Sequence, residues 1–99
     1  MSHTAHIVST TTNYAHRINV GRHELLADEP PTLGGQDAGP APFDLYLASL
    51  AACTAITLRM YAQRKGWDLG ELRAELTLSH GVDDKPHVHR RLSASGALD

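Results

Sequence analysis

The chain has 99 residues, enough for one domain at most, and its 41% hydrophobic and 20% charged residues are typical of a globular protein. A net charge of −2 and the lack of a basic stripe argue against nucleic acid and anionic membranes as partners. The single cysteine excludes an internal disulfide framework and a cysteine-rich zinc site. No secretory signal pattern is visible at the N-terminus, so we expect one cytoplasmic domain over residues 1–99.

Residues 5–27 are predicted to form three short antiparallel strands that follow one another as a meander. The β-branched segment 7–12 is the first strand. Residues 14–20 alternate in the manner of a half-buried strand, and Gly21 permits a reversal into a third strand over 23–27.

Residues 28–41 are rich in proline and glycine, which forbids a regular helix or ladder and predicts a loop. A loop of this length inside a small domain is either functional or a mobile surface connection, and the composition leaves both open. The acidic pairs Asp28-Glu29 and Asp83-Asp84 are predicted to keep loops hydrated, because adjacent residues on a strand point to opposite faces and make no acid–base dyad.

The segment 42–65 is predicted to be one long helix. Pro42 suits the first turn, Asp44 lies near the positive end of the dipole, and Gly66 follows Arg64 and Lys65 as a stop signal. The uncharged run 45–58 is too short to span a bilayer and predicts a core helix that is buried nearly all round. A domain of this size can cover one side of such a helix, so we expect a homodimer with this helix at or near the interface.

Residues 72–82 alternate between apolar and polar side chains and predict a strand with one hydrated face. The segment 81–86 is expected to turn the chain. Val88, Leu92 and Ala94 mark a partner strand.

Cys53 shares a face of the predicted helix with Ser49 and Thr57, four residues away on either side, and Thr54 flanks it. In one interpretation Cys53 is a small buried hydrophobe, and the hydroxyls donate to carbonyls one turn earlier. In the other, Cys53 is a reactive thiolate that accepts hydrogen bonds from these hydroxyls.

A thiolate at Cys53 needs a cation from outside its own helix. It lies about three turns from the helix start, where the dipole contributes little. Arg59 is six residues further on and points to another face. The remaining candidates are Arg17, Arg22, His23 and Arg90.

Three histidines around the predicted C-terminal hairpin raise the alternative of a zinc site. His87 and His89 share a face of their strand, and His80 lies across the turn. No carboxylate or thiol accompanies them at a standard ligand spacing, which favours solvated histidines and no metal. Gly34-Gly35 has neither a preceding strand nor a following Lys-Ser/Thr, so a phosphate loop is excluded.

Five segments occur in a characteristic order: HELLADEP at 23–30, GG at 34–35, GPAP at 39–42, LYLASLAACT at 45–54 and TLRMYA at 57–62. In this order they resemble the OsmC/Ohr family of osmotically inducible and organic-hydroperoxide-resistance proteins. The resemblance implies an α+β fold with an antiparallel sheet and a long buried central helix. It also implies an intertwined homodimer with active sites where the subunits meet.

The resemblance further implies a thiol peroxidase that needs no cofactor. Cys53, as a thiolate, would attack the O–O bond of an organic hydroperoxide and become a sulfenic acid. In the family a second cysteine, in a later Cys-Pro segment, then forms a disulfide that an external dithiol reduces. That cysteine is absent here, and we expect the chain to lack the family's last helix and strand, so that Cys53 would depend on an external thiol.

The sequence departs from the organic-hydroperoxide branch at a second place, where Phe43 replaces the glutamate that follows the proline. Asp44 stands one residue later and is the nearest carboxylate, and Arg22 is nominated as the activating cation. Ser49, Thr54 and Thr57 are the expected binding residues around Cys53.

The predicted function is therefore thiol-dependent reduction of organic hydroperoxides in oxidative or osmotic stress, with Cys53 as nucleophile. The alternative is a non-catalytic relative that binds a small apolar ligand in the dimer cleft, with Cys53 structural.

Overall fold

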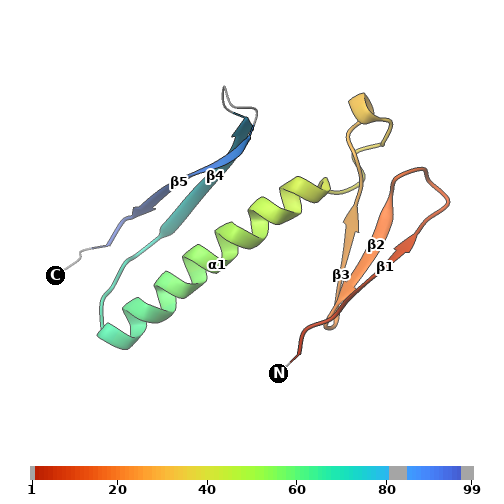
Figure 1. The fold of residues 1–99 in the computed structure, drawn as a ribbon. Coiled ribbons are helices and arrows are strands. Elements are labelled where there is room, and N and C mark those ends of the chain that lie inside the picture. The colour runs from red at the N-terminus through yellow and green to blue at the C-terminus, as the bar shows by residue number, and fades with distance from the viewer. Residues whose placement is uncertain (1, 81–84, 97–99) are drawn as a thin grey trace. The chain divides into compact units, whose positions relative to one another are not determined.

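The computed structural model describes residues 2–80 and 85–96. The chain forms two compact units, Met1–Leu45 and Tyr46–Asp99. The first contains three strands and the start of a long helix, and the second contains the rest of that helix and a two-stranded hairpin (Figure 1). The prediction of a single domain over 1–99 stays a prediction, and the units are taken one at a time below.

The N-terminal unit is built on the predicted antiparallel meander. Strands β1 (Ala5–Ser9), β2 (His16–Val20) and β3 (His23–Ala27) pair in the order β1-β2-β3. Directly opposed residues share a face of the sheet, and the register places Ile7, Ile18 and Leu25 in one apolar row across the three strands.

The first two strands are shorter than predicted. Strand β1 ends at Ser9, because Thr10 leaves the ladder and its Oγ1 accepts a hydrogen bond from the Thr12 N–H at 3.1 Å and donates to the Ala15 carbonyl at 2.8 Å. Threonine side chains compete with the strand ladder in this way. The bend buries Ala15, whereas Tyr14, predicted to lie in the second strand, stays outside β2 and is 48% exposed.

The loop over residues 28–41 is folded against the end of β3. It contains a short 3-10 helix, η1 (Pro31–Leu33), which ends at Gly34 with a φ of 95°. The expectation that Asp28 keeps the loop hydrated is wrong, because Asp28 is 2% exposed and its carboxylate accepts backbone hydrogen bonds from within the loop. The Asp83-Asp84 pair lies outside the described residues.

Helix α1 (Pro42–Lys65) has the predicted bounds. Its first turn is capped by Asp44, whose Oδ2 accepts the Ala41 N–H at 3.1 Å, an arrangement that satisfies a donor left free at the helix start. Its end is closed by Gly66 with a φ of 74° and by a bond of 2.8 Å from the Trp67 N–H to the Ala62 carbonyl. This pattern is a Schellman motif, in which glycine adopts the left-handed conformation without strain.

The expectation that α1 is buried nearly all round is wrong for the chain by itself. Ala62 is the buried residue of the helix. One stripe of α1 is half-buried, and it contains Leu47, Leu50, Ala51, Thr54, Ala55, Leu58 and Arg59. By length and composition α1 could cross a membrane. The core helix of a soluble protein meets the same criteria, so one such helix is weak evidence for a membrane span.

The second half of the C-terminal unit is the predicted hairpin. Strands β4 (Leu72–His80) and β5 (Pro86–Ala94) pair antiparallel, and the predicted turn residues 81–84 lie outside the described part. One face, called the inner face here, is half-buried at Leu72, Ala74, Leu76, Leu78 and Val88. This period of two confirms the predicted pattern of one apolar and one hydrated face.

The best-buried apolar side chains of this unit lie in the last turn of α1 and in the segment between α1 and β4. Ala62 is 1% and Leu69 2% exposed. The Leu69 carbonyl accepts the Gly96 N–H at 2.6 Å, and the Glu71 carbonyl accepts the Ser95 N–H at 3.1 Å. These bonds join the residues just after β5 to the chain just before β4.

Candidate functional site

Cys53 is exposed on the side of α1 that faces away from the half-buried stripe. At 100° per residue, Cys53 lies about 145° from the middle of that stripe. The residues on its own side are also exposed, namely Tyr46, Ser49, Ile56, Thr57 and Met60. The expectation of a buried cysteine is therefore wrong for the chain by itself, because nothing in the described part of the C-terminal unit covers this face.

Two of the three predicted binding hydroxyls are bonded to the helix backbone. Ser49 Oγ donates to the Tyr46 carbonyl at 2.7 Å, and Thr54 Oγ1 donates to the Leu50 carbonyl at 2.8 Å. A hydroxyl has one proton to donate, so in this conformation neither donates to the Cys53 sulfur. Thr57 is exposed and lies one turn after Cys53 on the same side of the helix.

The nominated cation and carboxylate belong to the N-terminal unit. Arg22 is exposed in the turn between β2 and β3, and Asp44 caps the start of α1. Arg17 and His23, also candidates for the cation, lie in β2 and β3 of this unit. Cys53 belongs to the C-terminal unit, so these residues are not brought together within one unit.

Three arginines of the C-terminal unit bind groups other than Cys53 or lie on the hairpin. The Arg59 guanidinium donates to the Gly70 carbonyl, and Arg73 forms an ion pair with Glu71. Arg90 lies opposite Leu76 on the inner face of the hairpin. None of these three interactions or positions directs a guanidinium toward the exposed Cys53 side of α1.

Asp28 organises the loop over residues 28–41, a role that was not predicted from the sequence. Its Oδ1 accepts the Glu29 N–H at 2.8 Å, and its Oδ2 accepts the Gln36 and Ala38 N–H groups at 3.1 Å each. Burial raises the pKa of this carboxyl, but the three N–H donors and the nearby His16 outweigh burial, so its pKa lies below the ordinary value. An aspartate directly after a strand and before a glycine-rich loop was the available signal.

A mainly apolar pocket of about 260 Å³ adjoins Asp28 within the N-terminal unit. It is lined by Ile7, Tyr14, His16, Ala27, Asp28, Glu29 and Pro42. His16 is oriented by a hydrogen bond of 2.8 Å between its Nδ1 and the Tyr14 carbonyl. The lining of the pocket therefore includes both the end of β3 and the first residue of α1.

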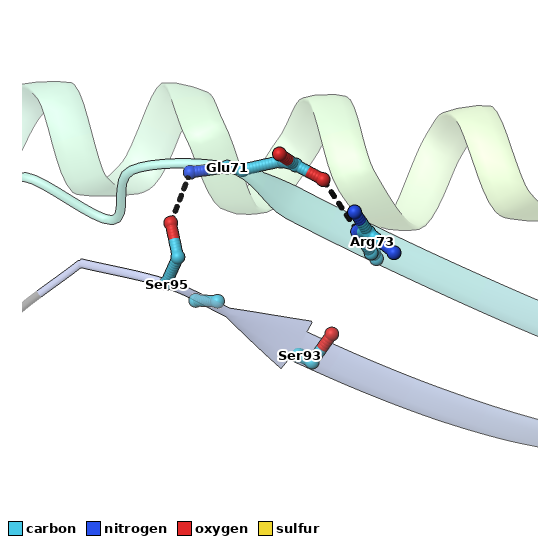
Figure 2. A pocket seen from close by; sticks show the side chains of 5 residues that line it. Glu71, Arg73, Ser93 and Ser95 are labelled. Carbon is cyan, nitrogen blue, oxygen red and sulfur yellow. Dashed lines mark hydrogen bonds and ion pairs between the residues drawn. The ribbon is translucent and has the colours of Figure 1, made fainter.

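A second pocket, of about 340 Å³, lies over the end of the hairpin (Figure 2). Figure 2 shows Ser95 bonded to the Glu71 N–H and Glu71 paired with Arg73. These polar groups already have partners, and the residues that line the pocket include no thiol or imidazole. This pocket is not a candidate site.

The alternative of a three-histidine zinc site is wrong. His80 pairs with Pro86 on the inner face of the hairpin, whereas His87 and His89 pair with Ser79 and Thr77 on the other face. Across residues 2–80 and 85–96, no group of three histidine, cysteine, aspartate or glutamate side chains is placed to hold a metal ion.

Comparisons with known proteins identify the family. The OsmC-like protein family model matches residues 34–98, a span that includes Cys53 and most of the chain. No curated protein matches the sequence significantly.

Three solved structures have the same fold. A protein assigned to osmotic stress and detoxification responses from Psychrobacter arcticus matches with a TM-score of 0.81 at 22% identity, over 100% of this chain and 74% of its own. An OsmC-like protein from Mycoplasma pneumoniae matches with a TM-score of 0.73 at 17% identity, over 98% and 72%. The organic hydroperoxide resistance protein OsmC from Legionella pneumophila matches with a TM-score of 0.66 at 19% identity, over 99% and 74%. With its α+β fold of antiparallel sheets and one long helix, this chain belongs to the OsmC-like family.

Proposed function

We propose that the protein is a thiol-dependent peroxidase that reduces organic hydroperoxides in the cytoplasm during oxidative or osmotic stress. The observation that carries the proposal is the exposure of Cys53, the one cysteine of the chain, on the helix inside the segment that matches the family. A nucleophile must be reachable by its substrate, and Cys53 meets this requirement. The Legionella relative, which is named for hydroperoxide resistance, supports the choice of substrate class.

The chemistry proceeds in two balanced steps. The Cys53 thiolate attacks one peroxide oxygen, the O–O bond breaks, and the departing alkoxide takes a proton, which yields a sulfenic acid and an alcohol. Two external thiols then return Cys53 to the reduced state and are oxidised to a disulfide, with release of water. The protein is thus oxidised by the peroxide and reduced by the external thiol, and no cofactor takes part.

A homodimer is part of the proposal, because the Cys53 side of α1 is apolar and exposed. Tyr46, Ile56 and Met60 on this side are 52%, 59% and 59% exposed. Exposed apolar surface of this kind favours a protein partner. A second copy of the chain would cover these apolar side chains and leave the Cys53 thiol open to substrate in a cleft where the subunits meet. Arg22 is the cation proposed to stabilise the thiolate, and Asp44 is the carboxylate proposed to hold Arg22. Ser49, Thr54 and Thr57 are proposed to line the site.

The second candidate function is binding of a small apolar ligand in the dimer cleft, with Cys53 structural. The bonds from Ser49 and Thr54 to helix carbonyls favour it, because hydroxyls used in this way do not serve a thiolate. The two functions differ in what they predict for the reactivity of Cys53.

Intact-protein mass spectrometry distinguishes the two candidates. The reduced protein is mixed with one equivalent of cumene hydroperoxide or hydrogen peroxide in the presence of a sulfenic-acid trap, with Cys53→Ser as the control. The peroxidase proposal predicts rapid trapping at Cys53, faster with the organic peroxide, and no adduct in the control. Trapping no faster than that of free cysteine would leave ligand binding as the better account.

A further inference from the structure

The mainly apolar pocket of the N-terminal unit takes no part in the proposed chemistry. Its volume is about 260 Å³, and its lining residues all lie within Met1–Leu45. An apolar cavity of about 150 Å³ is large enough to bind benzene, so this volume suits one aromatic ring with a short substituent. The mainly apolar lining favours a ligand that is itself mainly apolar.

Three of the lining residues lie on one face of the three-stranded sheet. His16 and Ala27 are directly opposed in the register of β2 and β3. Ile7 is on the same face, because its partner Ile18 is two residues from His16. The sheet therefore contributes two apolar side chains and one imidazole to the pocket.

The lining residues outside the sheet are held in place by contacts within the same unit. The Tyr14 ring lies against the backbone of Gly34, where a Cβ would be 3.1 Å from Tyr14 Cε2. The Gly34 carbonyl accepts a hydrogen bond of 2.6 Å from Asn13 Nδ2, and the Glu29 N–H donates to Asp28 Oδ1 at 2.8 Å. The pocket is thus formed before a ligand arrives, which lowers the entropic cost of binding.

The imidazole of His16 offers the pocket a hydrogen-bond acceptor. Its Nδ1 lies 2.8 Å from the Tyr14 carbonyl, and a carbonyl can only accept, so Nδ1 carries the proton of the neutral ring. Nε2 is then unprotonated and can accept a hydrogen bond. A hydroxyl group on an apolar ligand is a donor that fits this nitrogen.

Two carboxylates also belong to the lining. Asp28 is 2% exposed and its oxygens already accept three backbone N–H groups, so a ligand gains little from it. Glu29 is half-buried, and its charge would favour an ammonium group instead of a hydroxyl. The imidazole of His16, unlike a mobile carboxylate chain, is oriented by a hydrogen bond to backbone, which favours the neutral ligand.

We propose that this pocket binds a small apolar alcohol, whose hydrocarbon part contacts Ile7 and Ala27 and whose hydroxyl donates to Nε2 of His16. The site needs neither the peroxidase chemistry of Cys53 nor a dimer cleft, because the groups that it uses lie in the N-terminal unit.

An NMR titration of the full chain with benzyl alcohol tests the proposal, with toluene and benzylammonium as ligands of similar size. The readouts are the dissociation constant, the methyl shifts of Ile7 and Ala27, and the nitrogen shift of His16 Nε2. Saturable binding of benzyl alcohol at about 1 mM is expected for a ligand of this size. The Nε2 shift should respond to benzyl alcohol and not to toluene, and benzylammonium should bind more weakly.

His16→Asn tests the acceptor, because the asparagine amide can still donate to the Tyr14 carbonyl but has no group at the place of Nε2. The variant should bind benzyl alcohol about two- to tenfold more weakly and bind toluene as the wild type does. His6→Asn is the matched control, since His6 pairs with Asn19 on the opposite face of the same sheet. A folded His16→Asn variant with the wild-type affinity for benzyl alcohol would refute the role of His16.

Ile7→Ala and Val8→Ala form a second matched pair. The two residues are neighbours in β1, are 61% and 60% exposed, and lie on opposite faces of the sheet. Because both are exposed, both variants should fold. Ile7→Ala should weaken the binding of benzyl alcohol and toluene alike by about threefold, and Val8→Ala should leave both unchanged.

Three outcomes would overturn the proposal. One is the absence of saturable shifts at Ile7, Ala27 and His16 up to about 10 mM benzyl alcohol. The second is that the shifts appear instead at Tyr46, Ile56 and Met60, which would place the ligand on the Cys53 side of α1. The third is tighter binding of benzylammonium than of benzyl alcohol, which would assign the pocket to cations through Glu29.

Discussion

Leu69→Ala tests whether the C-terminal unit depends on the small core between α1 and β4. Leu69 is 2% exposed, and its backbone is tied to Gly96 by a hydrogen bond. The substitution removes three carbons, a transfer loss of about 2.4 kcal/mol. Incomplete collapse of the cavity adds to this loss, so we expect about 3 kcal/mol of destabilisation. For a chain of this length, that change lowers the melting temperature by about 12–24 °C.

Urea unfolding followed by Trp67 fluorescence measures this effect, because Trp67 is the one tryptophan of the chain and lies two residues from Leu69. Leu92→Ala is the control, since Leu92 is 50% exposed and should cost about 1 kcal/mol by its smaller burial. The slope of free energy against urea should stay the same in both variants. If Leu69→Ala loses no more stability than Leu92→Ala, the core assignment is refuted.

Three further predictions concern the N-terminal unit. Asp44→Ala removes the acceptor for the Ala41 N–H and should cost about 0.5–1 kcal/mol in thermal unfolding; an unchanged stability would argue against the cap. The pKa of Asp28 is lowered in the folded state, so its contribution to stability is fully present above the unfolded value of about 3.9 and is lost as the pH falls through the folded value. The stability difference between wild type and Asp28→Asn should therefore shrink below about pH 4, and a difference that grows there would reverse the sign of the argument. Gly39→Ala should lower the free energy of unfolding by about 1–3 kcal/mol, because the new Cβ collides with backbone. Gly21→Asn is the control: it lies in open space at a φ of 59° and should stay within about 0.5 kcal/mol of wild type by chemical denaturation. Equal losses of stability in the two variants would contradict the close approach at Gly39.

The long helix and the hairpin were predictable because their signals are local. Pro42, Asp44 and Gly66 mark the ends of α1, and the observed bounds agree with them. The alternation that begins at Leu72 likewise predicts one apolar face, and the register shows it. Periodicity and capping depend on neighbours within a few residues, so a single sequence contains them.

The arrangement of the loop and the exposure of Cys53 were not predictable, because both depend on distant partners. Asp28 finds donors eight and ten residues away, and its acidity suggested a hydrated surface. Similarly, an uncharged helix suggests burial, but the apolar composition of α1 does not say which molecule covers it. Whether His80 and His87 lie on the same face of the hairpin also depends on a distant partner. It is decided by the register between β4 and β5, which the alternation within each strand does not contain.

The most direct test of the central claim is the second-order rate constant for oxidation of Cys53 by cumene hydroperoxide, measured on the reduced full chain with free cysteine as reference. The account predicts a rate constant at least a hundredfold above that of free cysteine, a smaller one for hydrogen peroxide, and no reaction in Cys53→Ser. A rate constant equal to that of free cysteine would contradict the peroxidase function and favour a protein that binds its ligand without transforming it.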